Sequence, residues 1–311
     1  MRALVTRGFG GTETLDVAEI PVPEAGPGQL RLKVAAAAVN PVDVATRAGM
    51  LAAGGLMGFR DVVGLGWDVA GTVDQVGAGV SGFTVGDEVI GLSDLLELPA
   101  KTQAEYVVLD ADTVALSPRG VPATRAATLP LNGLTAAQAL DLLDLRPGQT
   151  LLVTGAAGGV GGFAVQLAAS QGLHVVAVAG ERDESLVRGF GARWFVPRGA
   201  DLAPAVRALV PGGVDGALDA AVVGNHARDA VRGAGAFVAV VGGAAPVPLR
   251  GIRVENVWIR ADGRRLAELA ALVEKGELTL PSVETYPLEQ AAAAQDRLAA
   301  GGLRGRLVLV P

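Results

Sequence analysis

The chain has 311 residues, half of them apolar, and this length accommodates two domains with substantial hydrophobic cores. Its formal net charge is −6 and charged residues make up 19% of it, so it lacks the basic character that attracts nucleic acid or an anionic membrane. It contains no cysteine, which excludes disulfides, thiolate zinc sites, iron–sulfur clusters and cysteine nucleophiles.

The N-terminal segment MRALVTRGFGG contains an apolar run that is too short for a secretory signal. No window of the sequence approaches the stretch of about 18 uninterrupted apolar residues that indicates a membrane helix. We therefore expect a soluble, cytoplasmic protein that has neither nucleic acid nor a membrane as a partner.

Residues 1–120 are typical of a small β-rich unit, because short apolar segments alternate there with frequent Gly and Pro. A turn or two of helix is expected only around Asp43 to Ala48. The expected strands are RALVTR, GQLRLKVAAAAV, DVAGTVDQVGAGV, GDEVIGL and AEYVVLD.

Residues 121–250 alternate apolar runs with longer segments of helical spacing. The runs TLLVTG, HVVAVAG, GALDAA and AFVAVVGG suit buried parallel strands. Alternating strands and helices predict an α/β fold with a doubly wound parallel sheet. Residues 251–311 contain two helical segments and the strand GRLVLVP, and we expect them to return to the first domain.

The stretch LLVTGAAGGVGGFAVQLAAS places a glycine-rich loop between a buried strand and a helix. Ala156, Gly158 and Gly161 occupy the three positions of the G-x-G-x-x-G fingerprint, with alanine at the first. Gly158 would let the main chain approach a pyrophosphate, and Gly161 would let helix and strand pack closely. The N–H groups at the helix start, including those of Gly159 and Val160, would bind the phosphate charge. A tight turn in a glycine-rich protein is the alternative.

The next strand ends at the position where such domains recognise the adenine-side ribose, about twenty residues after the loop. Ala179 and Gly180 form its tip, and Glu181 and Arg182 follow. Small residues followed by a cation favour a 2′-phosphate, so we expect NADPH, with NADH possible, and expect Arg182 to pair with the phosphate and Arg198 to assist. The alternative is a solvated loop whose charges face water.

The chain as a whole resembles the medium-chain dehydrogenase/reductase superfamily, in its zinc-independent branch of quinone oxidoreductases and related enone reductases. The resemblance implies a GroES-like catalytic domain, formed by residues 1–120 and 251–311, around a Rossmann cofactor domain formed by residues 121–250. It rests on seven segments in the family's order: AVNPVDVATRAG, GLGWDVAGTV, VGDEVIG, AEYVVLD, LPLNGLTAAQAL, VTGAAGGVG and GGLRGRLVLV.

The zinc-dependent members of this superfamily use cysteines and a GHE element to bind zinc. This chain has Gly66, Trp67 and Asp68 at the matching element and no cysteine. Without a Lewis acid, oxidation of unactivated alcohols is a poor proposal, whereas a quinone or an α,β-unsaturated carbonyl delocalises its own developing charge. We therefore expect hydride transfer to such a small molecule, without a metal, and a proton supplied by solvent.

The resemblance also implies site residues. Asn40 and Asp43 lie in the family's N-x-x-D element near the nicotinamide and are expected to be catalytic, with Asn40 contacting substrate or cofactor, although an exposed Asp43–Arg47 pair is an alternative for the acid. The tyrosine that quinone reductases often carry soon after this aspartate is absent. Asp68 is expected to be structural and paired with Arg47.

Further residues match segments that line the cofactor in the family. Asn132 and Thr135 match a segment beside the nicotinamide, where Asn132 is expected to bind the cofactor and Thr135 to be catalytic; a helix N-cap is the alternative for Thr135. Gly242 and Gly243 would let the nicotinamide half approach the main chain. Arg306 would reach the cofactor phosphate or pair on the surface.

Two other functions remain open on the sequence alone. One is a low-turnover dinucleotide-binding redox sensor, and the other is a biosynthetic tailoring reductase of a specialised enone. For the latter, residues 50–62 suggest an apolar pocket mouth with a lid at Gly54 and Gly55. The resemblance implies a homodimer through the edges of the Rossmann sheet, with residues 246–259 at the interface.

Overall fold

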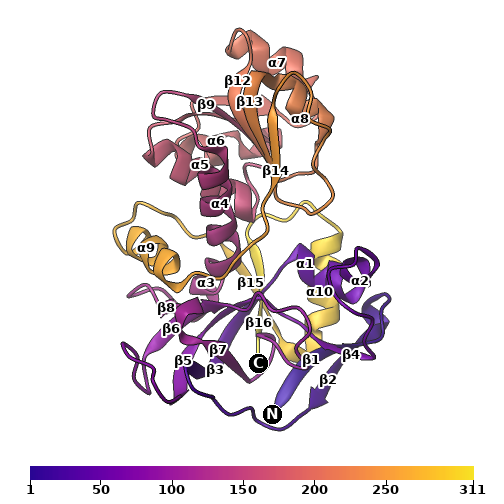
Figure 1. Cartoon of the computed structure of the whole chain (residues 1–311), viewed down its shortest axis with the longest axis vertical. Helices are drawn as coiled ribbons and strands as arrows, with labels where there is room; N and C mark the ends of the chain where they lie inside the picture. The colour runs from indigo at the N-terminus through magenta and orange to yellow at the C-terminus, as the bar shows by residue number, and fades with distance from the viewer. The chain divides into compact units, whose positions relative to one another are not determined.

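The computed structural model describes residues 1–311 and divides into two compact units (Figure 1). The first unit comprises residues 1–131, 260–276 and 280–311, and the second comprises residues 132–259 and 277–279. The sequence places the boundaries earlier, near residues 120 and 250. The later division keeps strand Arg253–Asn256 with the second unit, because this strand pairs with strand Val231–Ala239.

The first unit contains two β-sheets. Its strands are β1 (Arg2–Arg7), β2 (Leu15–Glu19), β3 (Gln29–Val39), β4 (Val62–Gly64), β5 (Asp68–Val76), β6 (Glu88–Leu92), β7 (Tyr106–Asp110), β8 (Val114–Leu116), β15 (Val283–Pro287) and β16 (Arg306–Val310). The smaller sheet has the order β2-β1-β4. The larger sheet has the order β15-β16-β3-β5-β6-β8, and β7 pairs with β3 beside this path.

The helices of the first unit are short, except near the C-terminus. They are α1 (Pro41–Arg47), α2 (Met50–Ala53), α3 (Ala123–Ala126), α9 (Gly263–Glu274) and α10 (Ala291–Ala299), with 3-10 turns η1 (Thr12–Thr14), η2 (Ala111–Thr113) and η4 (Leu288–Gln290). Strand β16 pairs antiparallel with β3, and Figure 1 shows α10 in yellow next to α1 in indigo, a contact between the two ends of the chain. The tail therefore lies in the N-terminal unit.

The second unit is built around one parallel sheet. Its strands are β9 (Thr150–Thr154), β10 (His174–Ala179), β11 (Trp194–Pro197), β12 (Val214–Asp219), β13 (Val231–Ala239) and β14 (Arg253–Asn256). Their order is β11-β10-β9-β12-β13-β14, and every neighbouring pair is parallel. This is the doubly wound order, in which the strands after β11 are added on the other side of the first strand, β9. The predicted parallel α/β sheet is confirmed.

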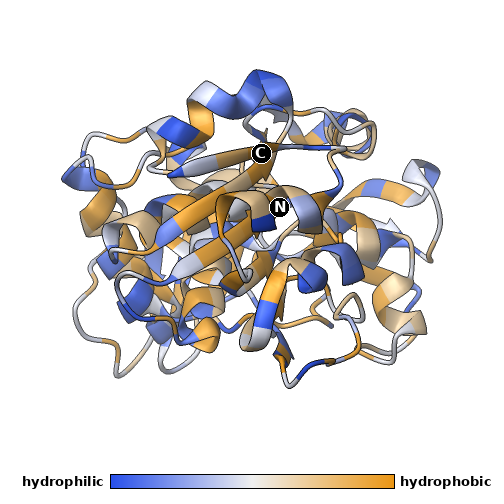
Figure 2. Cartoon of the chain, turned by 90° about the horizontal axis from the view of Figure 1, so that it is seen from above, coloured by the Kyte–Doolittle hydropathy of each residue, from blue (hydrophilic) through white to orange (hydrophobic).

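Helix α4 (Pro130–Leu143) leads into β9, and further helices connect the strands of this sheet: α5 (Gly159–Ser170), α6 (Glu184–Gly189), α7 (Leu202–Leu209) and α8 (Asn225–Ala230), with the turn η3 (Glu181–Asp183). The strands are apolar because both faces of a parallel sheet are covered, and Leu152, Val176 and Phe237 are fully buried. Figure 2 shows the strands largely in orange, whereas blue hydrophilic residues lie mainly on helices and loops. None of the helices combines the length and the apolar character needed to span a membrane.

Candidate functional site

The glycine-rich loop connects β9 to α5 at the carboxyl edge of the parallel sheet. Gly155 adopts φ +61°, a left-handed conformation that favours glycine, and so turns the chain out of β9. Gly158 is the N-cap of α5, which begins at Gly159, and no side chain caps this helix. The N–H groups of its first turn, including those of Val160 and Gly161, therefore lack partners within the helix. Such a helix start is suited to a phosphate.

Gly161 shows why the loop requires glycine. A Cβ atom on Gly161 would lie 2.2 Å from the carbonyl oxygen of Gly155 and 2.9 Å from Cα of Ala156. A Cβ atom on Gly158 would lie 3.1 Å from the same oxygen, which is tight but less severe. Ala156 itself is fully buried, so its methyl group is part of the core and not of the open face. The three fingerprint positions thus have different roles in the packing of helix against strand.

The tip of β10 lies next to the end of β11. The N–H of Arg198 donates to the carbonyl oxygen of Ala179 (2.7 Å), which brings Arg198 to the tip of the neighbouring strand. Gly180 is the N-cap of η3, and the exposed Arg182 lies within this turn. The two exposed arginines expected to read the ribose phosphate therefore both follow the carboxyl ends of adjacent strands. His174 lies at the opposite end of β10.

A buried carboxylate organises the loop after β12. Asp219 is 1% exposed, and its Oδ1 accepts hydrogen bonds from the hydroxyl of Thr154 (2.5 Å) and the N–H of Val223 (3.1 Å). Its Oδ2 accepts a bond from the N–H of Gly224 (2.7 Å). Asp219 thus ties the end of β9 to residues 221–224, and it fixes the second loop at this edge of the sheet.

We expect Asp219→Leu to lower the free energy of unfolding by about 2–3 kcal/mol, because the main-chain N–H groups that it satisfies lose their acceptor. Urea denaturation measures this loss. The control is Asp201→Leu, since Asp201 is exposed at the start of α7 and makes no capping bond there. A change of less than about 0.5 kcal/mol in Asp219→Leu, the range of ordinary surface substitutions, would contradict a structural role for this carboxylate.

The remaining predicted cofactor residues of the second unit lie on one helix and in one turn. Asn132 and Thr135 are buried side chains of α4, 4% and 7% exposed. Thr135 lies inside this helix, which begins at Pro130, so the N-cap alternative for Thr135 is wrong. Gly242 and Gly243 follow β13 in an exposed turn, where Gly243 adopts φ +79°.

A buried polar cluster occupies the first unit and centres on Asn40, which is 1% exposed. Its Nδ2 donates to Oδ2 of Asp68 (2.6 Å), and its Oδ1 accepts a hydrogen bond from Nη2 of Arg306. Its main-chain N–H donates to Oδ2 of Asp43 (2.7 Å), which caps the start of α1. The cluster joins α1, β5 and β16, which are distant in the sequence.

Both carboxylates of this cluster are fully buried, but they have main-chain donors. Asp43 accepts a bond from the N–H of Gly66 (3.0 Å), and Asp68 accepts one from the N–H of Leu131 in the first turn of α4. Burial raises the pKa of Asp43 to about 6 and that of Asp68 to about 7, although the N–H donors and Arg306 oppose this shift. The two acids therefore titrate close to neutrality.

The expected pairing of Asp68 with Arg47 is wrong, and so is the alternative pairing of Asp43 with Arg47. Asp43 forms no exposed pair with Arg47, and Asp68 does not pair with Arg47 either, because Arg47 points elsewhere. It is 7% exposed and donates to Oε1 of Gln295 (2.7 Å) and to the carbonyl oxygen of Gly10 (2.7 Å). Its role is to connect α1 to α10.

Arg306 is also buried, at 6% exposure, so the expected alternative of a surface pair is wrong. Its Nη2 donates to the carbonyl oxygen of Val39 (2.8 Å) as well as to Asn40. Burial lowers its pKa, whereas the charges of Asp68 and Asp43 raise it. The guanidinium is thus the positive charge that faces Asp68, and it shares this role at Asp43 with Lys101.

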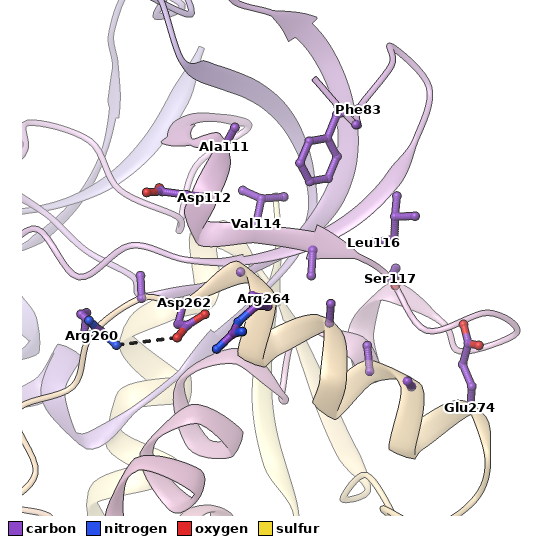
Figure 3. A pocket seen from close by; sticks show the side chains of 17 residues that line it. Phe83, Ala111, Asp112, Val114, Leu116, Ser117, Arg260, Asp262, Arg264 and Glu274 are labelled. Atoms are coloured by element: carbon purple, nitrogen blue, oxygen red, sulfur yellow. Dashed lines mark ion pairs between the residues drawn. The ribbon is translucent and has the colours of Figure 1, made fainter. Parts of the chain in front are cut away.

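Two cavities of the first unit lie apart from this cluster. The larger, of about 720 Å³, runs between α9 and the segment from η2 to β8, and none of the cluster residues lines it. Figure 3 shows Arg260 and Asp262, which form an ion pair, at one end of it, with Glu274 at the other and Phe83 across from them. The second cavity, of about 500 Å³, is lined mainly by apolar residues, and Ser93 and Asp94 also line it.

Two known domain families match the chain. Residues 26–119 match the alcohol dehydrogenase GroES-like domain, and residues 190–309 match the zinc-binding dehydrogenase family. The first match covers most of the β-rich part, and the second runs from the parallel sheet into the tail. These matches define a dehydrogenase-type chain with a GroES-like part and a parallel-sheet part, and they confirm the predicted fold class.

Individual proteins similar to this chain support the same family assignment. The NADPH-dependent alkenal/one oxidoreductase of Arabidopsis thaliana chloroplasts is 31% identical over 100% of this chain and 80% of that protein. The chloroplastic quinone-oxidoreductase homolog of Spinacia oleracea is 36% identical over 65% of this chain, and the match spans 64% of that protein. The solved quinone oxidoreductase of Coxiella burnetii has a TM-score of 0.89 and 29% identity, covering 100% of this chain and 99% of that one. The chain therefore belongs to the medium-chain dehydrogenase/reductase superfamily, in its quinone oxidoreductase-like branch.

Proposed function

We propose that the protein is a zinc-independent, NADPH-dependent reductase that transfers hydride to a quinone or an α,β-unsaturated carbonyl. The observation that carries the proposal is the loop of Gly158 and Gly161, whose uncapped helix start and close strand packing suit a dinucleotide pyrophosphate. The printed names of the Arabidopsis and Coxiella relatives support the substrate class. When bound, the nicotinamide supplies the hydride.

The side chains of this protein are a poor set of zinc ligands. The sequence has no cysteine, and no three His, Asp or Glu residues are grouped so that they would hold a metal. Asp68, at the element that resembles the zinc-binding GHE, already accepts bonds from Asn40 and Leu131. This donor chemistry supports a reaction in which an activated acceptor carries its own developing charge.

The proposal gives the two units different tasks. The pyrophosphate would be held by Gly158, Gly159, Val160 and Gly161. The ribose phosphate would be held by Gly180, Arg182 and Arg198. The nicotinamide half would lie along Asn132, Thr135, Gly242 and Gly243. Asn40 and Asp43 would fix the positions of the main-chain segments around the substrate site, because their side chains are hydrogen-bonded within the buried cluster. Arg306 would neutralise that cluster and so act away from the cofactor.

The direct test measures oxidation of NADPH and of NADH, with benzoquinone, phenanthrenequinone and methyl vinyl ketone as acceptors, together with binding of each cofactor. The proposal expects turnover with NADPH and at least one acceptor. Tight binding without turnover on any acceptor would favour the redox-sensor alternative. No binding of either cofactor would overturn the proposal.

We expect Arg182→Ala to raise the Kd for NADPH about tenfold to a hundredfold and to leave the Kd for NADH unchanged, because only NADPH carries the 2′-phosphate. Isothermal titration with both cofactors measures the difference. Arg193→Ala is the matched control, since Arg193 stacks over the ring of Trp194 at the start of β11 (4.6 Å), away from the strand tip. An equal loss for both cofactors would contradict phosphate recognition by Arg182.

One further part of the proposal, the homodimer, rests on the sequence resemblance. A homodimer would use the edge strand β14, around which Val247, Leu249 and Trp258 are exposed apolar side chains. Light scattering of the purified protein tests this. The cytoplasmic location stays a prediction.

A further inference from the structure

Lys101 is a buried lysine in a chain that has few lysines. The sequence contains only three, and the other two, Lys33 and Lys275, are exposed. Lys101 is 3% exposed and lies between β6 and β7. Because lysine is almost never fully buried without a partner, its surroundings decide what it does.

The ammonium of Lys101 has an aromatic neighbour but no acceptor. Its Nζ lies 4.0 Å from the centroid of the Trp67 ring, a cation–π contact. The nearby charges that act on it are Asp43 in α1 and Asp94 after β6, yet neither forms an ion pair or a hydrogen bond with it. Its N–H groups therefore have no acceptor within the chain, so the carbonyl oxygen of a ligand would supply one.

Other polar atoms around Trp67 also lack a hydrogen-bond partner within the chain. The main-chain N–H of Ser93 donates to the carbonyl oxygen of Trp67 (2.8 Å), while the hydroxyl of Ser93 is buried and has no hydrogen-bond partner within the chain. The hydroxyl of Thr102, next to Lys101, is likewise buried without a partner. Trp67 directly precedes Asp68, so this group of donors adjoins the polar cluster of Asn40.

We propose that Lys101 is the acid of the reduction and binds the carbonyl oxygen of the substrate. This inference rests on the proposed function. When hydride adds to the β-carbon of an enone, the electrons of the C=C bond move to form the enolate, whose negative charge lies on oxygen. Lys101 donates a proton to that oxygen, which gives the enol and a neutral amine, and water returns the proton to the amine. The enol then converts to the saturated ketone.

The protonation equilibrium of Lys101 suits this step. Burial lowers its pKa to about 8, while the charges of Asp43 and Asp94 oppose the shift. An ammonium with this pKa is charged at neutral pH and gives up its proton readily. Since the protonated form is required, kcat/KM falls as the pH rises through about 8.

The test compares Lys101→Met, which keeps the length of the side chain, with Lys101→Arg and with Lys275→Met as the exposed control. We expect Lys101→Met to lower kcat with an enone about a hundredfold, as removal of a single oxyanion donor does, with NADPH affinity unchanged. Lys101→Arg keeps the charge, so its kcat/KM no longer falls through about pH 8. Lys275→Met behaves as the wild type. A merely structural role would change stability but not the pH profile.

A second measurement needs no turnover. The wild-type protein is treated with cinnamaldehyde and cyanoborohydride, which reduces the imine of an amine and an aldehyde to a stable secondary amine, and peptide mass mapping locates the adduct among the three lysines. We expect an adduct on Lys101, formed more slowly in the presence of a saturated ketone product.

The outcomes separate the two proposals. Wild-type turnover with an unchanged kcat and pH profile in Lys101→Met overturns the role of Lys101 and leaves the proposed function standing. Adducts only on Lys33 and Lys275 also overturn that role. No turnover by the wild type with any acceptor overturns the proposed function itself, and the proton transfer assigned to Lys101 with it.

Discussion

Replacing Gly161 by alanine is expected to weaken NADPH binding by at least about a hundredfold, which corresponds to about 3 kcal/mol of binding free energy. The added Cβ would lie 2.2 Å from the carbonyl oxygen of Gly155 and 2.7 Å from its carbonyl carbon. Because these contacts are with main chain, no side-chain rotation relieves them. Helix α5 must move away from β9, and the N–H groups of its first turn then lose their position against the pyrophosphate.

The matched control is Gly162→Ala, one residue further along the same helix. A Cβ there would lie 3.4 Å from the ring of Phe190, an ordinary contact, and alanine has the higher helix propensity. We expect this variant to bind NADPH like the wild type and to gain up to about 1 kcal/mol of stability. Cofactor titration and thermal denaturation of both variants give the comparison. Wild-type affinity in Gly161→Ala would show that the close approach is not needed for binding.

The glycine loop could be predicted from the sequence because all of its determinants are local. The strand TLLVT, the turn at Gly155 and the glycine-rich, apolar start of α5 are consecutive, and each has its own chemical signature. The position of the tip of β10 could be predicted as well, because β10 belongs to the same βαβ unit as the loop. The parallel order of the sheet follows from alternating strand and helix, since crossover connections leave few topologies.

The polar cluster could not be predicted in the same way, because its contacts join distant segments. The Arg306–Asn40 bond spans 266 residues, and the Arg47–Gln295 bond spans 248. A spacing of four residues indicated an Asp43–Arg47 pair, but tertiary contacts give each side chain a different partner. The segment PAKTQAEY contains no pattern that marks Lys101 as buried, and only the fold places it over Trp67.

Replacing Arg306 by methionine is expected to lower the free energy of unfolding by about 3–5 kcal/mol at about pH 8, because it leaves the buried Asp68 without its counter-charge and Asp43 with that of Lys101 alone. Methionine retains much of the side-chain length, so the loss measures charge and hydrogen bonding more than volume. Val39 and Asn40 each lose a donor as well. Urea denaturation measures the change, and Arg304→Met on the same segment is the control, since Arg304 is exposed.

The pH dependence of this loss identifies its cause. In the folded protein the pKa values of Asp43 and Asp68 are raised to about 6 and about 7, above the ordinary 3.8, so folding favours their protonated forms. The stability that these raised pKa values contribute is complete below pH 3.8 and is lost as the pH rises through about 7. Without Arg306 the two pKa values rise further, so the penalty grows in alkaline solution and shrinks at about pH 5, where neutral carboxyls need no counter-charge. We therefore expect Arg306→Met to approach the wild type at about pH 5, with a residual loss of about 1–2 kcal/mol from the missing hydrogen bonds. An equal loss at both pH values would mean that packing, and not the buried charge, makes Arg306 necessary.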